Sequence, residues 1–298
     1  MLEAVENKID SFIKELNEED LVEVISKIPA GKRLRAKLIL EIAGDTSKAI
    51  TTAAIVEMIH AASLLHDDVI DNANTRRGVA SINAIFGNKS AIMIGDILYS
   101  KAFYELIDID NSIAKVISNA VVELSIGERK DVYMSNEFNA NIEDYKQMIY
   151  QKTAALIEAA AQSAAILANK PQDIYKTYGK NLGIAFQMID DILDIISDSK
   201  TLGKPALSDF KEGKTTLPYI YLYHKLPQKE KEKLKSMHKK ELSKEEQNWI
   251  LEKFKEYKII EYCKKEALDL VKEAIKLMQD ANEKGLEAIA IKMVDRSF

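Results

Sequence analysis

Apolar residues recur at spacings of three and four along almost the whole chain, which is the period of an amphipathic helix. Leu2, Val5, Ile9 and Phe12 set this pattern in the first segment. The 298 residues include only 11 Gly and 5 Pro, and no stretch shows the sustained alternation typical of a half-buried strand. The sequence therefore predicts an all-α protein. Because we find no internal repeat and no dividing linker, we expect a single helical domain over residues 1–298.

Breaks in the apolar pattern place the expected helices and loops. Helices are predicted from Leu2, and over about residues 18–27, 32–44, 47–71, 88–107, 112–134, 141–167, 171–196 and 216–224. From Pro227 onward the chain is rich in Lys and Glu, which predicts a peripheral helical layer with Ser243 as a cap. Ser47 is expected to cap the long helix that precedes residue 71. Residues 72–80 and 197–213 are expected to form loops.

Composition excludes several classes of protein. The formal net charge of −5 argues against non-specific binding of nucleic acid. The one cysteine, Cys263, cannot form an internal disulfide, so we expect a reducing compartment, the cytoplasm. The N-terminal segment lacks the apolar core of a signal peptide. The most apolar window, residues 153–168, is too short and too polar to span a bilayer, so we expect no transmembrane segment.

One stretch concentrates charge that helix packing alone does not require. The segment HAASLLHDDVIDNANTRRG, which runs from His60 to Gly78, contains Asp67, Asp68, Asp71, Arg76 and Arg77. Carboxylates four apart on a helix repel by about 0.2–0.5 kcal/mol per pair, so the row of Asp67 and Asp71 indicates a bound cation. Mg²⁺ fits, because it takes one or two carboxylates and completes its shell with water and phosphate. The alternative is a solvated acidic helix end followed by a basic loop.

A second acidic row has the same spacing. The segment FQMIDDILDI contains Gln187, Asp190, Asp191 and Asp194 inside an otherwise apolar helix. Unpaired charges buried in such a helix would cost several kcal/mol per ion, so these carboxylates must be paired or bind a metal. If the two helices face each other across a bundle, their six carboxylates could hold about two or three Mg²⁺ ions around one diphosphate.

Three groups of basic residues accompany the acidic rows. Lys32, Arg33 and Arg35 follow Gly31 at an expected helix start, where backbone N–H groups also favour an anion. Arg76 and Arg77 form the second group, and the third comprises Lys152 with Thr153, Lys204 and Lys214. Acidic rows bind phosphate through a metal, whereas basic groups bind it directly. The presence of both indicates two diphosphates, although each basic group alone could be a solvated patch.

These motifs together resemble the trans-prenyl diphosphate synthases of the isoprenoid (polyprenyl) synthase family. The resemblance covers about residues 31–218 and rests on GKRLR, HDDVIDNANTRRG, FQMIDDILD and GKP…SDFKEGKTTLP, in that order. It implies antiparallel helices around a central cavity, a homodimer, and about two or three Mg²⁺ ions per active site. Ala30 and Ala36 depart from the family pattern, in which glycine and proline are common at these positions.

The resemblance also implies a role for each matching residue. The metal ligands would be Asp67, Asp71 and Asp190, supported by Asp68, Asp191 and Asp194. The allylic diphosphate would be held by Arg76, Lys152, Thr153, Gln187, Lys204 and Lys214. Isopentenyl diphosphate would be held by Gly31, Lys32, Arg35, His60 and Arg77. Of these, the aspartates of the first motif with Lys152, Gln187, Asp190 and Lys204 would act directly in catalysis.

Product length is expected to depend on the helix turn that precedes Asp67. Ile59, Ala62 and Ser63 stand there, and short-chain members of the family are known for bulky residues near the last two positions. Small residues at both positions predict a long product, about octaprenyl, made from farnesyl diphosphate. The alternatives are a short-chain synthase, a terpene cyclase and a non-catalytic subunit of a heteromeric synthase. Release of a long product would involve transient membrane contact.

Overall fold

A computed structural model describes residues 1–196 and 207–294 of the chain, and in these ranges it is almost entirely helical. The all-α prediction is therefore confirmed. The helices are α1 (Leu2–Lys14), α2 (Glu19–Ser26), α3 (Leu34–Ala43), α4 (Ser47–Ile70), α5 (Ile82–Phe86), α6 (Asn88–Leu106), α7 (Asn111–Met134), α8 (Ile142–Ile149), η1 (Tyr150–Ala154), α9 (Ala155–Leu167), α10 (Gln172–Ile196), α12 (Ser208–Lys211), α13 (Leu217–Lys225), α14 (Gln228–Ser236), α15 (Lys244–Glu256), α16 (Ile259–Asp280) and α17 (Lys284–Val294).

The chain divides into two compact units. The first comprises Met1–Val122 and Leu156–Gly179, and the second comprises Glu123–Ala155 and Lys180–Phe298. Helices α7 and α10 each contribute residues to both units, so the division does not follow separate stretches of sequence. The expected single domain over residues 1–298 stays a prediction.

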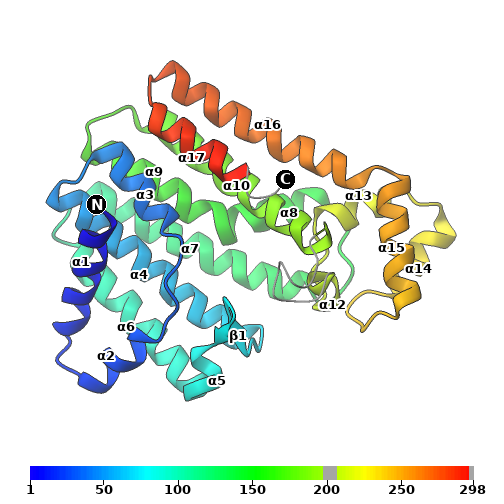
Figure 1. The fold of residues 1–298 in the computed structure, drawn as a ribbon, viewed down its shortest axis with the longest axis horizontal. Coiled ribbons are helices and arrows are strands. Elements are labelled where there is room, and N and C mark those ends of the chain that lie inside the picture. Colours follow the sequence, from blue (N-terminus) through cyan, green and yellow to red (C-terminus); the bar gives the residue numbers. More distant parts are fainter. Residues whose placement is uncertain (197–206, 295–298) are drawn as a thin grey trace. The chain divides into compact units, whose positions relative to one another are not determined.

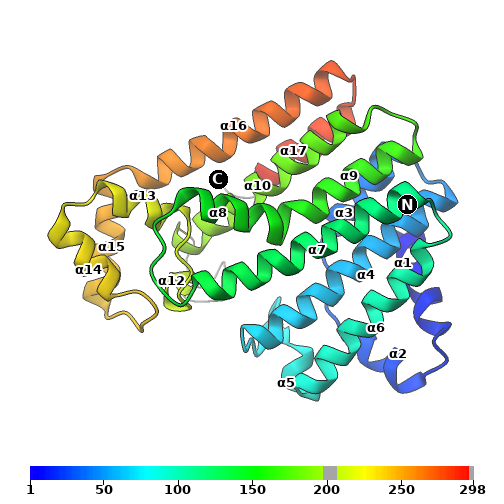
Figure 2. The same cartoon turned by 180° about the vertical axis from the view of Figure 1, so that it is seen from behind.

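The first unit is built around α4. This helix contacts α1, α3, α5 and α6, and Figures 1 and 2 show α6 running beside it along much of its length. Thr46, and not Ser47 as expected, caps α4, because the Thr46 side chain accepts a hydrogen bond from the Ala49 N–H. By length and composition α4 is apolar enough to cross a membrane, but 67% of its most apolar 18-residue window is buried inside the protein. That burial is typical of the core helix of a soluble protein.

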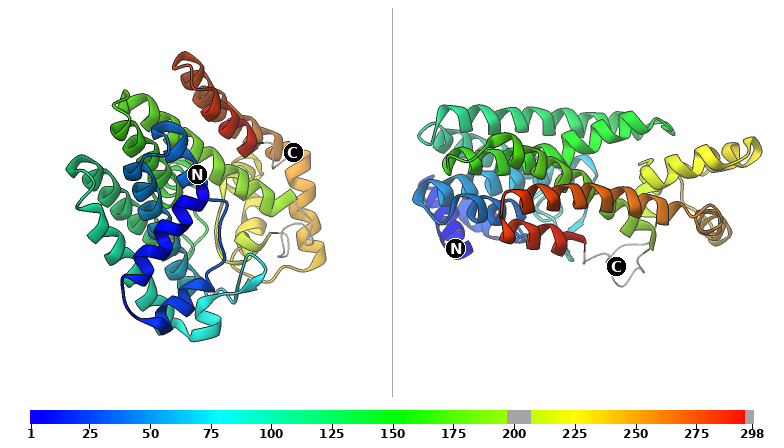
Figure 3. Two further views of the ribbon diagram at one scale, coloured as in Figure 1. Left: turned by 60° about the vertical axis from the view of Figure 1, so that its left-hand side comes forward. Right: turned by 90° about the horizontal axis from the view of Figure 1, so that it is seen from above.

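The second unit has a core rich in aromatic side chains. Phe210 of α12 stacks on Tyr219 of α13 with ring centroids 4.2 Å apart, and Phe254 of α15 meets Tyr219 edge-on. Helices α16 and α17 lie side by side, as Figure 3 shows from two directions. Ser243 caps α15 through a complete capping box with Glu246, as the sequence predicts. These contacts give the Lys- and Glu-rich part of the chain its own buried face.

The structure differs from the sequence prediction mainly at short elements. Strands β1 (Thr75–Arg76) and β2 (Val79–Ala80) pair as an antiparallel hairpin inside the expected loop 72–80. Helix α5 and the four-residue α12 were not expected, because segments this short carry too little apolar periodicity to be recognised. The expected helix 141–167 is one helical run, but η1 in its middle is a π-helical turn. Such turns are rare and occur frequently at functional sites.

Candidate active site

The first aspartate motif lies at the C-terminal end of α4. Asp68 is 3% exposed and receives a forked pair of hydrogen bonds from Arg76, with the Nη2–Oδ1 distance at 2.6 Å and the Nε–Oδ1 distance at 2.8 Å. The β1–β2 hairpin thus folds back onto the helix end, and this pair fixes it there. Asp67 is half-buried and Asp71, the C-cap residue, is exposed. These two carboxylates are therefore the ones that solvent reaches.

His66, beside the motif, anchors this end of α4 to α6. Its Nε2 lies 3.1 Å from the carbonyl oxygen of Ile92 and 3.5 Å from Oδ1 of Asp96. Gly95 makes this contact possible, because a Cβ at that position would lie 2.3 Å from Nε2 of His66. Close packing of the imidazole on α6 therefore fixes the rotation of α4 from which Asp67 projects.

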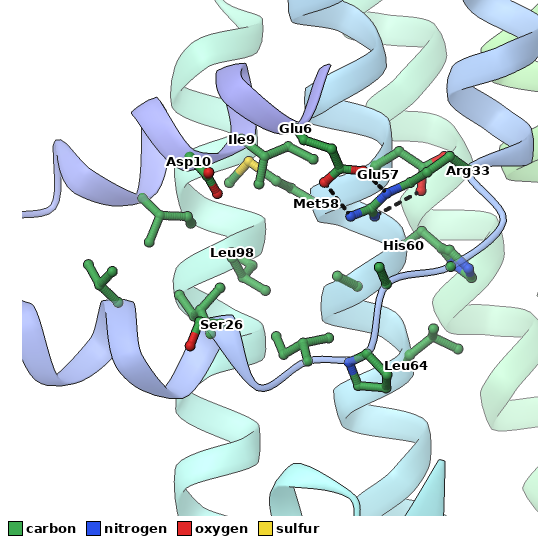
Figure 4. Close-up of a pocket in the computed structure, with 18 of the residues that line it drawn as sticks. Glu6, Ile9, Asp10, Ser26, Arg33, Glu57, Met58, His60, Leu64 and Leu98 are labelled. Atoms are coloured by element: carbon green, nitrogen blue, oxygen red, sulfur yellow. Dashed lines mark hydrogen bonds and ion pairs between the residues drawn. The ribbon is translucent and has the colours of Figure 1, made fainter. Parts of the chain in front are cut away.

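The basic segment before α3 is held by two carboxylates. Arg33 adopts a left-handed conformation (φ 51°) and pairs with Glu6 of α1 at 2.6 Å and with Glu57 of α4 at 3.4 Å. Glu57 is 2% exposed, and its second oxygen accepts a hydrogen bond from the Ala36 N–H. The GKRLR segment is therefore positioned by two ion pairs of Arg33, one with the buried Glu57 and one with the partly exposed Glu6 (Figure 4), and not by a glycine-rich turn.

Arg35 of α3, His60 of α4 and Arg77 of the β1–β2 hairpin form a second basic group, and the nearby Glu57 offsets part of the positive charge at Arg35 and Arg77. Burial, and then the nearby Arg77, lowers the pKa of Arg35, and the buried Nε of Arg35 has no hydrogen-bond partner among the described residues. Burial holds the pKa of His60 well below its usual range, reinforced by Arg35, Arg77 and the other arginines. Arg77 donates one hydrogen bond to the Pro29 carbonyl at 2.7 Å, and its pKa is also lowered, first by burial. This excess of partly buried positive charge favours an anion.

The second aspartate motif lies on α10. Asp191 is 3% exposed, and it accepts hydrogen bonds from Tyr145 at 2.5 Å and from Gln187 at 2.9 Å. Burial, and then the negative charge of Asp209, raises the pKa of Asp191 to about 8. Gln187 in turn accepts a hydrogen bond from Thr153 at 2.8 Å. The chain of hydrogen bonds fixes the amide orientation of Gln187.

The other two aspartates of the motif are placed differently. Asp194 is 2% exposed; it accepts a hydrogen bond from the Ser208 hydroxyl at 2.5 Å and from the Asp209 N–H at 3.2 Å. Asp194 thus fixes the start of α12. Asp190 is exposed. Of the three, Asp190 is the carboxylate most accessible to a solvated ion.

Lys152 stands in the π-helical turn η1 between two buried carboxylates. Its Nζ lies 2.6 Å from Oδ2 of Asp131 and 2.7 Å from Oε2 of Glu128, both on α7. The turn is packed tightly: a Cβ at Gly127 would lie 2.3 Å from the Lys152 nitrogen, and one at Gly183 would lie 2.5 Å from the Ala154 Cα. Two glycines on α7 and α10 therefore permit the backbone of η1 to lie where it does.

The remaining predicted residues fall in varied surroundings. Lys32 is exposed, and Lys214 pairs with Glu212 at 2.9 Å. Lys204 lies outside the described residues. Ile59, Ala62 and Ser63 are all buried in the first unit, and Ser63 donates a hydrogen bond to the His60 carbonyl. The expectation that the two aspartate motifs face each other stays a prediction.

The donors of the two motifs fit Mg²⁺ chemically, because carboxylate oxygens are the hard ligands that it prefers. Within residues 1–196 and 207–294, no group of three or more His, Cys, Asp or Glu side chains is arranged to hold a metal ion. Mg²⁺ does not require such a group, since it binds through one or two carboxylates with water and substrate phosphate in its other positions. Asp67, Asp71 and Asp190 are the accessible carboxylates for that purpose.

Comparison with known proteins identifies the family of the chain. The profile of the polyprenyl synthetase family matches residues 18–254. A short chain isoprenyl diphosphate synthase from Methanothermobacter thermautotrophicus is 33% identical, over 97% of this chain and 93% of that protein. An octaprenyl diphosphate synthase from Haemophilus influenzae is 31% identical, over 100% of this chain and 98% of that protein. The crystal structure of octaprenyl pyrophosphate synthase from Helicobacter pylori superposes with a TM-score of 0.93, at 48% identity and 98% coverage of both chains.

The chain therefore belongs to the polyprenyl synthetase family. Its relatives are polyprenyl and octaprenyl diphosphate synthases, so the protein is a prenyltransferase with the all-α fold of the isoprenoid synthases. The resemblance inferred from the motifs is confirmed. The relatives include both short-chain and long-chain synthases, and they do not fix the product of this chain.

Sequence reasoning missed several residues that support the site. They are the carboxylates that hold arginine and lysine, and the hydroxyls that hold the second motif: Glu6, Glu57, Glu128, Asp131, Tyr145 and Ser208. One signal was available for Glu57, which interrupts an apolar run in α4. Glu128 and Asp131, three apart on α7, could have been recognised as one helix face. Tyr145 and Ser208 carry no comparable signal.

Proposed function

We propose that this protein condenses isopentenyl diphosphate with an allylic diphosphate, farnesyl diphosphate in the first instance, to make a long-chain polyprenyl diphosphate of about octaprenyl length for quinone or isoprenoid biosynthesis. The main support is the pair of chemically distinct phosphate sites. The cluster of Arg35, His60 and Arg77 binds an anion without a metal, whereas the aspartate motifs need one. Two diphosphate substrates require two such sites.

The basic cluster is suited to the diphosphate that does not leave. Arg35 and Arg77 present guanidinium forks, and neutral His60 can donate one hydrogen bond without adding charge. Binding here keeps the isopentenyl group in place while its double bond acts as the nucleophile. No side-chain nucleophile is needed for this chemistry.

The two aspartate motifs and the polar residues near the second motif are suited to the allylic diphosphate. Magnesium held by Asp67, Asp71 and Asp190 would neutralise charge on the departing diphosphate. Lys152 would add a direct contact, because the paired carboxylates of Glu128 and Asp131 hold its ammonium group at the π-helical turn. Thr153 and Gln187 present oriented dipoles to the reacting centre. Apolar walls would exclude water from the allylic cation.

The long product is supported by the small residues on α4. Ala62 and Ser63 are buried one helical turn before Asp67, where a large side chain would close the path of a growing chain. The octaprenyl synthase structure at 48% identity supports the same assignment. A short-chain product is the alternative, supported by the relative at 33% identity.

Product analysis tests this proposal directly. The purified chain is incubated with farnesyl diphosphate, labelled isopentenyl diphosphate and Mg²⁺, and the dephosphorylated products are separated by chromatography. An octaprenyl product is expected, and Ala62→Phe or Ser63→Phe should shorten it to geranylgeranyl length from farnesyl diphosphate, or to farnesyl length when geranyl diphosphate is the starter. Products of unchanged length in both variants would reject the role of this turn of α4. No incorporation by the chain alone would identify a non-catalytic subunit.

We further propose that the protein acts as a homodimer in the cytoplasm, with transient membrane contact when its apolar product leaves. Met93 and Tyr104 of α6 and its C-cap residue Ile107 fall on one face by helical spacing, and they are 58%, 67% and 71% exposed. An apolar face of this kind favours a partner. Cys263 is buried and unpaired, which suits a reducing compartment. Light scattering of the purified protein tests the dimer: a monomer mass at micromolar concentration would reject it.

A further inference from the structure

A short turn in the second unit sets where the side chain of Lys214 begins. Residues 209–214, which we call the lysine-bearing turn, are closed by backbone hydrogen bonds. The Gly213 N–H donates to the Phe210 carbonyl at 3.1 Å, and the Lys214 N–H donates to the Asp209 carbonyl at 2.8 Å. Gly213 has a φ of +94°, in the left-handed region that favours glycine. The direction in which Lys214 leaves the backbone therefore depends on how this turn is held.

His238 holds the lysine-bearing turn from the linker between α14 and α15. Its Nε2 lies 2.6 Å from the carbonyl oxygen of Gly213, and the residue is only 9% exposed. Because a carbonyl oxygen can only accept, Nε2 must carry the hydrogen and donate it. The next residue makes a second tie, since the Lys239 N–H donates to the Phe210 carbonyl at 3.2 Å. Two consecutive residues of the linker therefore hold the turn at two points.

The surroundings of the turn leave it little room to shift. A Cβ at Gly213 would lie 2.5 Å from the carbonyl oxygen of Ser135, at the end of α7. The His238 ring meets the Phe210 ring edge-on, with centroids 5.6 Å apart, and Phe138 meets both rings edge-on as well. The imidazole of His238 thus makes two separable contributions. Its ring packs against two aromatic neighbours, and its Nε2–H bonds to the backbone of the turn.

The ammonium group of Lys214 is not held firmly by its own partner. Its Nζ lies 2.9 Å from Oε2 of Glu212, whose side chain is 51% exposed. Ion pairs at the surface contribute only about 0–1 kcal/mol, so this pair does not fix the ammonium in one place. The lysine stem has four flexible carbons. Where the ammonium can bind an anion is therefore decided largely by where the turn places the backbone of Lys214.

We propose that His238 is a positioning residue for the allylic substrate: its hydrogen bond to the Gly213 carbonyl holds the lysine-bearing turn, so that the ammonium of Lys214 meets the allylic diphosphate. His238 acts through the turn and not by contact with the reactants. The inference rests on the proposed function, because it takes Lys214 to bind that diphosphate. Loss of the hydrogen bond should therefore weaken the allylic substrate and leave isopentenyl diphosphate unaffected.

Two substitutions at this position separate the hydrogen bond from the packing. His238→Phe keeps an aromatic ring beside Phe138 and Phe210 but removes the donor, whereas His238→Gln removes the ring and keeps an N–H donor. The whole protein is assayed with farnesyl diphosphate, isopentenyl diphosphate and Mg²⁺. His238→Phe should raise the KM for farnesyl diphosphate about tenfold, because one lost hydrogen bond shifts an equilibrium by about that factor. His238→Gln should recover most of this loss.

The chain offers a matched control in a second histidine. Nε2 of His224 lies 2.9 Å from the carbonyl oxygen of Ala140, just before α8, so this contact is of the same kind but does not involve the lysine-bearing turn. His224→Phe should match the wild type in both KM values. Thermal melts of all variants set the assay temperature below every unfolding midpoint. An impaired His238→Gln beside a fully active His238→Phe would overturn the inference, because packing and not the hydrogen bond would then matter.

A double-mutant cycle tests whether His238 acts through Lys214. His238→Phe should weaken the allylic substrate in the wild-type background and have no further effect in Lys214→Ala, because the position of an absent ammonium cannot matter. Independent, multiplying effects would overturn the inference. Calorimetry with farnesyl diphosphate and Mg²⁺, without isopentenyl diphosphate, repeats the cycle without condensation. If the wild type condenses nothing but this binding cycle is non-additive, the proposed function is wrong and His238 still positions Lys214 for a diphosphate.

Discussion

The close approach of α7 to the π-helical turn makes Gly127 the most informative position for a single added methyl group. In Gly127→Ala the new Cβ would lie 2.3 Å from the Lys152 nitrogen, 2.7 Å from the Gln151 carbonyl carbon and 2.8 Å from the Lys152 Cα. All three are backbone atoms, so no side chain can rotate away. Either α7 or the turn must move.

The expected change in stability is the sum of two opposed effects. Alanine favours an interior helical position over glycine by about 0.8–1 kcal/mol. Forcing an atom into a packed interior costs about 1–3 kcal/mol. We therefore expect Gly127→Ala to lower the free energy of unfolding by up to about 2 kcal/mol. Urea denaturation followed by far-UV circular dichroism measures this difference.

The expected change in activity is larger than the change in stability. Lys152 belongs to the turn that must shift, and a misplacement of about 1 Å can cost about 100-fold in rate. We expect kcat/KM for the allylic substrate to fall by about this factor, while binding of isopentenyl diphosphate in EDTA stays unchanged. Arg129→Ala is the control, because Arg129 is exposed on the same helix. Wild-type stability and activity in Gly127→Ala would refute the argument that close backbone packing positions Lys152.

Three further predictions follow from the site. Burial, and then the nearby arginines, hold the pKa of His60 far below its usual range. Below about pH 6.5 the unfolded chain therefore binds more protons than the folded protein, and the free energy of unfolding falls as the pH falls. In urea melts at about pH 7.5 and 5.5, His60→Asn should reduce this loss, whereas the control His224→Asn, at an exposed position, should not. Gly95→Ala would place a Cβ 2.3 Å from His66 Nε2, so it should raise the Mg²⁺ concentration for half-maximal activity, and an unchanged Mg²⁺ titration would contradict the role given to this contact. EDTA should abolish condensation and leave the thermal unfolding midpoint within about 2 °C, since no described contact of the fold needs a metal; a large fall would point to a structural ion.

The all-α fold class and the long helices were predictable because the apolar residues of these helices recur regularly over many turns. The run before Asp71 and the run before residue 196 both appear as predicted, as α4 and α10. The short elements were not predictable, since α5 and α12 contain too few residues for a period to show. The π turn η1 is a further example, because its position depends on the close approach of Gly127 and Gly183 from other helices.

Some residues of the candidate site were predictable from the sequence, and others were not. The aspartates and arginines were recognisable because charge inside an apolar period is unusual, and the structure places Asp68 and Asp191 in buried hydrogen-bonded positions. The partners of these residues were not recognisable. Tyr145 reaches Asp191 from 46 positions away in the sequence, and only the packing of α8 on α10 brings the two side chains together. Contacts of that range arise from tertiary structure, which local pattern does not encode.

The ion pair between Glu6 and Arg33 has a practical consequence for anyone who shortens or tags this chain. Helix α1 looks dispensable, since it stands before the family motifs and most of its charged residues are exposed. Yet its Glu6 carboxylate accepts two hydrogen bonds from Arg33, at 2.6 and 2.7 Å. Phe12 of the same helix is buried in the first unit. Removal of α1 would take away the Glu6 carboxylate that holds Arg33 in the basic segment. Low affinity for isopentenyl diphosphate in such a truncated protein would reflect the lost ion pair and not a poor enzyme.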